Sequence, residues 1–98
     1  MRDRREVERI PCAGWLEYRL QDAVAGQIMD ISKLGIGFVG ALPAGVGDTL
    51  ELVLMNRNVV VQGSVRHIRL GHDERFRIGV KFAREEEDLA SVLLEMAT

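Results

Sequence analysis

Cysteine is almost absent from this 98-residue chain, because Cys12 is the only one. A single cysteine excludes an internal disulfide framework and any zinc site built from several cysteines, and it is typical of a reducing cytoplasm. Aromatic residues make up 5% of the chain, so a platform of rings for stacking nucleic-acid bases is not expected. No apolar run reaches the roughly 18 residues of a membrane span, and no apolar segment of a secretory signal follows the charged N-terminus. We expect a cytoplasmic protein.

Lysine is also scarce, since Lys33 and Lys81 are the only two among thirteen basic residues and the other eleven are arginines. The formal net charge of −2 and the pI near 5.7 argue against a protein that holds DNA or RNA by bulk positive charge. Arginine, in contrast, suits planar and bidentate recognition of an anion. The composition therefore favours a few specific guanidinium contacts, with no DNA or RNA partner.

Short runs rich in Val, Ile and Leu, separated by Gly, Asn and Asp, are typical of an all-β domain. Polar and apolar residues alternate within several runs, as half-buried strands require. Residues 56–58 suit a tight hairpin turn, and residues 43–48 and 71–74 are expected to be loops. The predicted strands are Ala13–Leu20, Gln27–Ile31, Gly35–Val39, Thr49–Met55, Val59–Ile68 and Arg77–Phe82.

The last part of the chain changes to a helical period. Leu89, Val92, Leu93 and Met96 follow the spacing i, i+3, i+4 and i+7, behind a run of acidic residues that favours a helix N-terminus. We therefore predict one domain over 1–98: a flexible arginine-rich arm (1–10), a six-stranded antiparallel β-barrel (11–83) and a C-terminal α-helix (84–97) that covers one barrel opening.

The N-terminal arm carries an Arg-x-x-x-Arg spacing at Arg5 and Arg9, with Arg4 directly in front. Guanidinium groups four residues apart on a flexible segment can close on one compact anion, by pairing with phosphate oxygens or with the O6/N7 edge of guanine. The alternative is a charged tail that is simply solvated.

A second motif, Asp-x-Ser-x-x-Gly, contains Asp30, Ser32 and Gly35, where a strand runs into a turn. Side chains two apart on a strand point to the same face, and a glycine lets backbone approach a ligand closely. Asp30 could accept hydrogen bonds from a guanine while Ser32 contacts a phosphate. Alternatively, the same residues make an Asx or Ser turn.

The two motifs in this order, within a domain of this length, resemble the PilZ domain family. Its members are small β-barrels that bind the bacterial second messenger cyclic di-GMP. The resemblance implies that Arg5 and Arg9 hold the guanines and phosphates of the ligand. It also implies that Asp30 and Ser32 make polar contacts with the ligand and that Gly35 permits the turn. In the family, an arginine at the position of Arg4 tends to accompany binding of two stacked ligand molecules.

The resemblance implies a noncatalytic receptor, without a cofactor, that binds cyclic di-GMP and acts through a downstream protein in motility, biofilm or virulence control. One alternative is a PilZ-type adaptor of pilus or flagellar machinery that does not bind nucleotide. A second is a small barrel that binds single-stranded nucleic acid, which the acidic pI and the few aromatic residues disfavour.

Other polar residues carry weaker signals. His67 and His72, close to Asp73 and Glu74, could be imagined as a metal site, but surface histidines at a strand end are the better interpretation. No serine or cysteine has the context of a catalytic nucleophile, so no enzyme is expected. A second basic group is either a solvated edge or an added attraction for an anionic ligand or a partner. It consists of Arg66, Arg69, Arg75 and Arg77.

Overall fold

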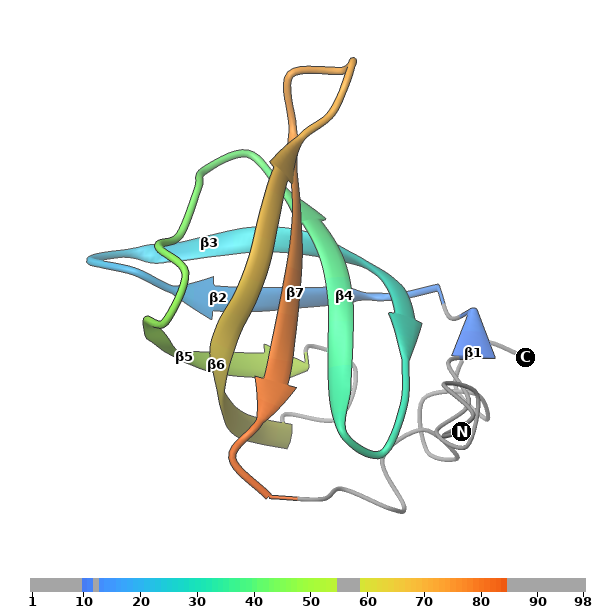
Figure 1. Ribbon diagram of the computed structural model, residues 1–98, viewed down its shortest axis with the longest axis vertical. Helices are drawn as coiled ribbons and strands as arrows, with labels where there is room; N and C mark the ends of the chain where they lie inside the picture. The colour runs from blue at the N-terminus through green and yellow to red at the C-terminus, as the bar shows by residue number, and fades with distance from the viewer. Residues whose placement is uncertain (1–9, 12, 55–58, 85–98) are drawn as a thin grey trace, which may run out of the picture.

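The computed structural model describes residues 10–11, 13–54 and 59–84, and these residues form β-strands joined by turns and loops, with no helix among them. The strands are β1 (Ile10–Pro11), β2 (Trp15–Arg19), β3 (Ala23–Ile31), β4 (Gly35–Gly40), β5 (Thr49–Leu54), β6 (Val59–Leu70) and β7 (Phe76–Phe82) (Figure 1).

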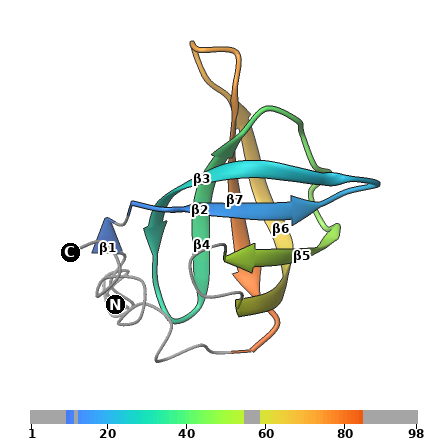
Figure 2. The ribbon, with the colours of Figure 1, turned by 180° about the vertical axis from the view of Figure 1, so that it is seen from behind.

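Six of these strands close into an antiparallel barrel. Around the ring the order is β3-β2-β5-β6-β7-β4, and β4 pairs with β3 to close it. Strands β4, β6 and β7 form one side of the barrel, and β2 and β5 cross behind them (Figure 1 and, from behind, Figure 2). Closure matters because it leaves these strands without the long unpaired edges that an open sheet would expose. The fold is thus the predicted six-stranded antiparallel β-barrel, to which β1 adds a short pairing at the end of β3.

The barrel interior is filled by the apolar residues that alternate along the strands. Leu16 on β2 and Leu52 on β5 are fully buried, and so is the sole tyrosine, Tyr18. The Tyr18 ring packs tilted against Phe38 with 4.9 Å between ring centroids. Its hydroxyl donates to the carbonyl of Leu42 at 2.7 Å and accepts the Leu42 N–H at 3.1 Å. Burial raises the pKa of Tyr18 above its ordinary value of 10.0, against smaller lowering effects of the Leu42 hydrogen bond and the Arg75 charge.

The predicted strands differ from the observed ones mainly at their ends. Strand β3 begins at Ala23 rather than Gln27, because its first residues pair with β2 through the register Arg19↔Ala23 to Trp15↔Gln27. The prediction missed this half of the strand because alanine and glycine have little β-propensity of their own. Strand β6 runs two residues further, to Leu70, and Ile10, which was assigned to the arm, belongs to β1.

The predicted connections agree with the structure where it describes them, since loops or turns separate β4 from β5 and β6 from β7. Strands β5 and β6 pair directly up to Leu54↔Val59, as a hairpin requires. The predicted turn itself (56–58) and the predicted helix beyond Arg84 lie outside the described residues.

Candidate functional site

One row of residues runs across the outer surface of four neighbouring strands. His67 on β6 is opposite Gly79 on β7, Gly79 is opposite Gly37 on β4, and Gly37 is opposite Asp30 on β3. The two central positions carry no side chain, so the row is low in the middle and bordered by an imidazole on one side and a carboxylate on the other. This shape brings together groups that are 37 residues apart in the sequence.

Two β-bulges place the end groups of this row on the outside. In β3 the register shifts between Ile28 and Asp30, and in β6 it shifts between Val65 and His67. Ile28 and Val65 point into the barrel and are buried. Because alternate residues of a regular strand share a face, Asp30 and His67 would follow them inward without the extra residue. Bulges often re-aim side chains beside functional sites in this way.

The row lies in a groove with a volume of about 500 Å³, within the range of roughly 300–1,000 Å³ that small-molecule sites occupy. Its floor is shaped by the two glycines. A Cβ atom added to Gly37 would lie 3.0 Å from Oδ1 of Asp30, and one added to Gly79 would overlap the ring of His67. The Asp30 carboxylate therefore leans over β4, and the imidazole lies flat on β7. The groove is lined by Met29, Asp30, Gly37, Phe38, His67, Ile68, Arg69, Arg77 and Ile78.

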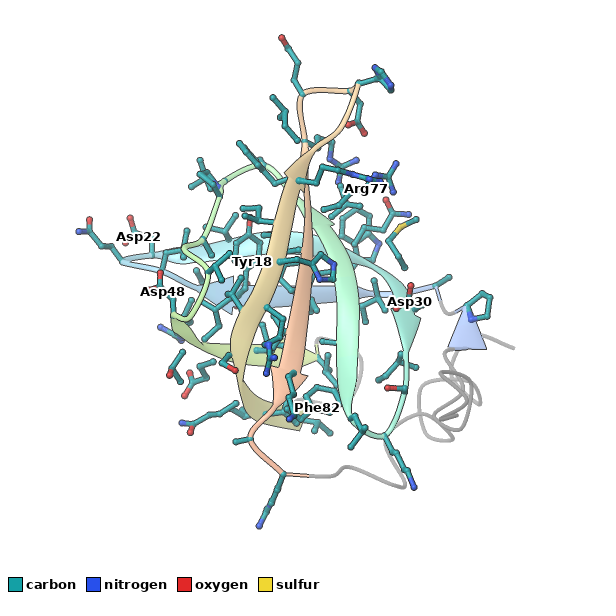
Figure 3. All side chains as sticks on the ribbon, in the orientation of Figure 1. Tyr18, Asp22, Asp30, Asp48, Arg77 and Phe82 are labelled. Atoms are coloured by element: carbon teal, nitrogen blue, oxygen red, sulfur yellow. The ribbon has the colours of Figure 1, made fainter. Side chains whose placement is uncertain are left out.

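The groove holds charges of both signs. Arg69 and Arg77 line it from β6 and β7, and Asp30 lines it from β3. Figure 3 shows Arg77 and Asp30 on the same side of the molecule, one above the other. Such a surface can bind a ligand that is itself both a hydrogen-bond donor and an anion, as a purine nucleotide is.

The predicted arm joins the barrel beside Asp30. In β1, Ile10 is opposite Ile31 and Pro11 is opposite Asp30. Ile10 is bonded to Arg9, so the attachment point of the arginine motif lies at the same end of β3 as the acidic residue of the second motif. Arg4, Arg5 and Arg9 themselves lie outside the described residues.

Ser32 and Gly35 do not line the groove. The Ser32 side chain is 1% exposed, and its hydroxyl accepts the N–H groups of Leu34 and Gly35, both at 3.2 Å. The expectation that Asp30 and Ser32 share one face was therefore wrong, because β3 ends at Ile31 and Ser32 turns into the connection with β4. This geometry is the Ser turn that the sequence left open as the alternative.

Gly35 allows a close approach, but to another strand. A Cβ atom at this position would lie 2.4 Å from the carbonyl oxygen of Val80 on β7. The carbonyl of Leu34, the residue before Gly35, accepts a hydrogen bond from the N–H of Phe82 on β7 at 2.8 Å. Gly35 therefore holds β4 tightly against β7 and helps to close the barrel.

Neither a metal site nor a membrane span is found among the described residues. In this part of the chain, no group of three or more His, Cys, Asp or Glu side chains could hold a metal ion. It also contains no helix that is long and apolar enough to cross a membrane.

The family model of the PilZ domain matches residues 3–97. The chain belongs to the PilZ domain family. No curated protein matches it in sequence, so the family match and the fold carry the relationship.

Solved PilZ structures share the fold of this chain. The PilZ domain of YcgR from Escherichia coli with c-di-GMP has a TM-score of 0.67 at 17% identity, over 97% of this chain and 89% of that one. The Bacillus subtilis inhibitor of motility MotI/DgrA has a TM-score of 0.76 at 19% identity, over 98% of this chain and 50% of that one. The K. pneumonia MrkH–c-di-GMP complex has a TM-score of 0.68 at 15% identity, over 98% of this chain and 52% of that one. The PilZ chain thus spans about half the length of MotI/DgrA and MrkH.

His67 lines the groove but was not predicted as a ligand-site residue, because the sequence suggested either a metal ligand or, preferably, a surface histidine at a strand end. Arg69 and Arg77 were noted as basic, but were not connected to Asp30. A usable signal was the pair of glycines at outward strand positions, Gly37 and Gly79, because a glycine inside a strand often marks the close approach of another group.

Proposed function

We propose that this PilZ domain is a noncatalytic cytoplasmic receptor for cyclic di-GMP, which binds across the groove beside Asp30 and signals to a protein partner. Arg5 and Arg9 of the arm supply positive charge to the ligand. Asp30 accepts hydrogen bonds from a guanine. Ser32 and Gly35 hold the turn that fixes the end of β3, and a direct contact of Ser32 with the ligand stays a prediction.

The observation that carries this proposal is the groove itself, with the Asp30 carboxylate leaning over Gly37 at the strand where the arm attaches. A carboxylate reads the N–H donors of guanine, while guanidinium groups bind its O6/N7 edge or phosphates. Cyclic di-GMP carries both kinds of group. Asp30 alone would repel the two phosphates, so the site needs the compensating charge of the arginines.

The experiment is a calorimetric titration with cyclic di-GMP, with GTP and cyclic di-AMP as specificity controls. We expect saturable binding of cyclic di-GMP only, and at least tenfold weaker binding by Arg5→Ala and Arg9→Ala, equivalent to about 1.4 kcal/mol each. Arg19→Ala is the matched control, because Arg19 lies on β2 and pairs with Glu51 at 3.3 Å, away from the groove.

The same titration gives the stoichiometry. Arg4 stands directly before the first motif arginine, and we propose that two stacked ligand molecules bind to each domain. One bound ligand per protein in both the wild type and Arg4→Ala would refute the two-ligand stoichiometry and leave the receptor function intact.

The domain would act through another molecule, in motility, biofilm or virulence control. The MotI/DgrA neighbour is named as an inhibitor of motility, which makes a motility protein the first partner to test. If the wild type shows no saturable binding of cyclic di-GMP, the PilZ-type adaptor of pilus or flagellar machinery replaces the receptor. If the domain instead binds a single strand of nucleic acid, the affinity for that strand should fall steeply with salt, because a long strand releases many counterions. A ligand with two phosphates releases few, so its affinity should depend only weakly on salt.

A further inference from the structure

The second basic group divides into members with different surroundings. Arg75 lies close enough to Tyr18 for its charge to lower the pKa of the phenol, and it does not line the groove. Arg66 is exposed at the bulge of β6 and does not line the groove. Arg69 and Arg77 do line the groove. Only this pair therefore faces the candidate ligand site.

Arg69 and Arg77 are directly opposite each other in the β6–β7 ladder. Opposite residues in an antiparallel pair have Cβ atoms about 4.5–5.5 Å apart, and like charges in these positions destabilise a sheet by several tenths of a kcal/mol. The same row continues across the barrel through Val39 and Gln27, neither of which is charged. The pair therefore adds repulsion to the folded domain without a counter-charge in its own row.

Two acidic groups lie nearby, but neither forms an ion pair with Arg69 or Arg77 in the described part of the chain. Asp73, in the β6–β7 hairpin, accepts the backbone N–H of Arg75 at 3.2 Å. Asp30 belongs to the next row, opposite Gly37. An anion that enters the groove would relieve this repulsion.

We infer that Arg69 and Arg77 form a phosphate-binding pair, and that both guanidinium groups hold one phosphate of the cyclic dinucleotide whose guanine is read by Asp30. This inference rests on the proposed function. The two rows are successive outward positions of the same strands, and such positions lie about 7 Å apart. A base and its phosphate, which the ribose separates, can therefore occupy both rows. Two guanidinium groups suit a phosphate because each can donate a bidentate pair of hydrogen bonds.

The test compares Arg69→Gln, Arg77→Gln and the double variant with Arg66→Gln as the matched control, by calorimetry with cyclic di-GMP at constant ionic strength. We expect each groove variant to bind about tenfold more weakly and the control to stay within about twofold of the wild type. If both arginines hold one phosphate, the double variant loses less affinity than the product of the single losses.

Thermal melts without ligand give a second readout. Because removal of one guanidinium relieves the repulsion, Arg77→Gln and Arg69→Gln should keep or slightly raise the Tm, whereas a structural role would lower it. In a separate series at constant ionic strength, inorganic pyrophosphate should raise the Tm of the wild type and of Arg66→Gln more than that of Arg77→Gln.

The outcomes separate the two claims. If the wild type binds cyclic di-GMP and both groove variants bind it equally well, the phosphate-binding pair is refuted and the receptor function stands. If the wild type does not bind cyclic di-GMP but pyrophosphate stabilises it through Arg77, the anion site stands and the receptor function fails. An equal response of all variants to pyrophosphate, together with unchanged affinities, overturns the pair.

Discussion

The segment from Asp30 to Gly37, which contains the Asp-x-Ser-x-x-Gly motif, has two regions with opposite surroundings. Ser32 and Gly35 lie inside the turn between β3 and β4, where the hydroxyl is buried and the glycine touches backbone of β7. Asp30 and Gly37, on the two strands that this turn joins, border the open groove. This short segment thus combines residues that build the barrel with residues that border the groove. Substitutions should therefore divide into losses of stability and losses of affinity.

Gly35→Ala should produce the largest effect. The new methyl group would meet the carbonyl oxygen of Val80 at 2.4 Å, and a backbone atom in a closed ring of strands cannot rotate away. We expect a loss of about 3 kcal/mol, and a Tm about 12 °C lower in a thermal melt. A Tm within about 3 °C of the wild type would show that β4 and β7 can separate without cost. It would contradict the claim that Gly35 is needed for the stability of the barrel.

Ser32→Ala should follow. It removes the acceptor of two N–H groups in the buried turn, which costs about 2 kcal/mol and lowers the Tm by about 8 °C. Ser64→Ala, at a half-buried position of β6, is the matched control and should leave the Tm nearly unchanged. Below its Tm, Ser32→Ala should bind cyclic di-GMP within about threefold of the wild type. A stable variant with tenfold weaker binding would instead make Ser32 a direct ligand contact.

Asp30→Asn should show the opposite pattern, because it keeps the shape of the side chain and removes the charge that a guanine would meet. We expect about tenfold weaker binding of cyclic di-GMP, equivalent to 1.4 kcal/mol, and a Tm within about 4 °C of the wild type. Asp22→Asn, in the exposed turn before β3, provides the control for a change of net charge. Equal affinities of Asp30→Asn and the wild type would remove Asp30 from the site.

Gly37→Ala should have the smallest effect. It is the most direct comparison for Gly35→Ala, because both glycines lie on β4. Its Cβ would lie 3.0 Å from the Asp30 carboxylate, which can shift by a few tenths of an ångström. We expect about threefold weaker binding, with a Tm near that of the wild type because alanine restricts the unfolded chain more than glycine does. If this variant loses as much stability as Gly35→Ala, Gly37 belongs to the fold rather than to the groove.

The fold could be predicted from local patterns. The alternation at Leu16 and Tyr18, and again at Leu50 and Leu52, identifies inward faces because a strand has a period of two residues, and these side chains are buried. The first half of β3 could not be predicted in this way. Its residues are held by pairing with β2, which no local preference encodes.

The site could be predicted only in part. Asp30 was identified from its motif, but its outward direction depends on the bulge at Met29, and that bulge follows from the register with β4. His67, Arg69 and Arg77 reach the same groove through long-range strand pairing. Spacing along the chain does not contain this information, because each register is set by contacts across the whole barrel.

The most direct test is a titration of the isotopically labelled domain with cyclic di-GMP, followed residue by residue through the backbone amide signals in NMR spectra. We predict saturable shifts along the row from Asp30 through Gly37 and Gly79 to His67, with little change at Glu51 and Val53 on β5, which lies outside the groove. Saturable shifts confined to β5, or no shifts at ligand concentrations that saturate a related receptor, would contradict the assignment of this groove as the binding site.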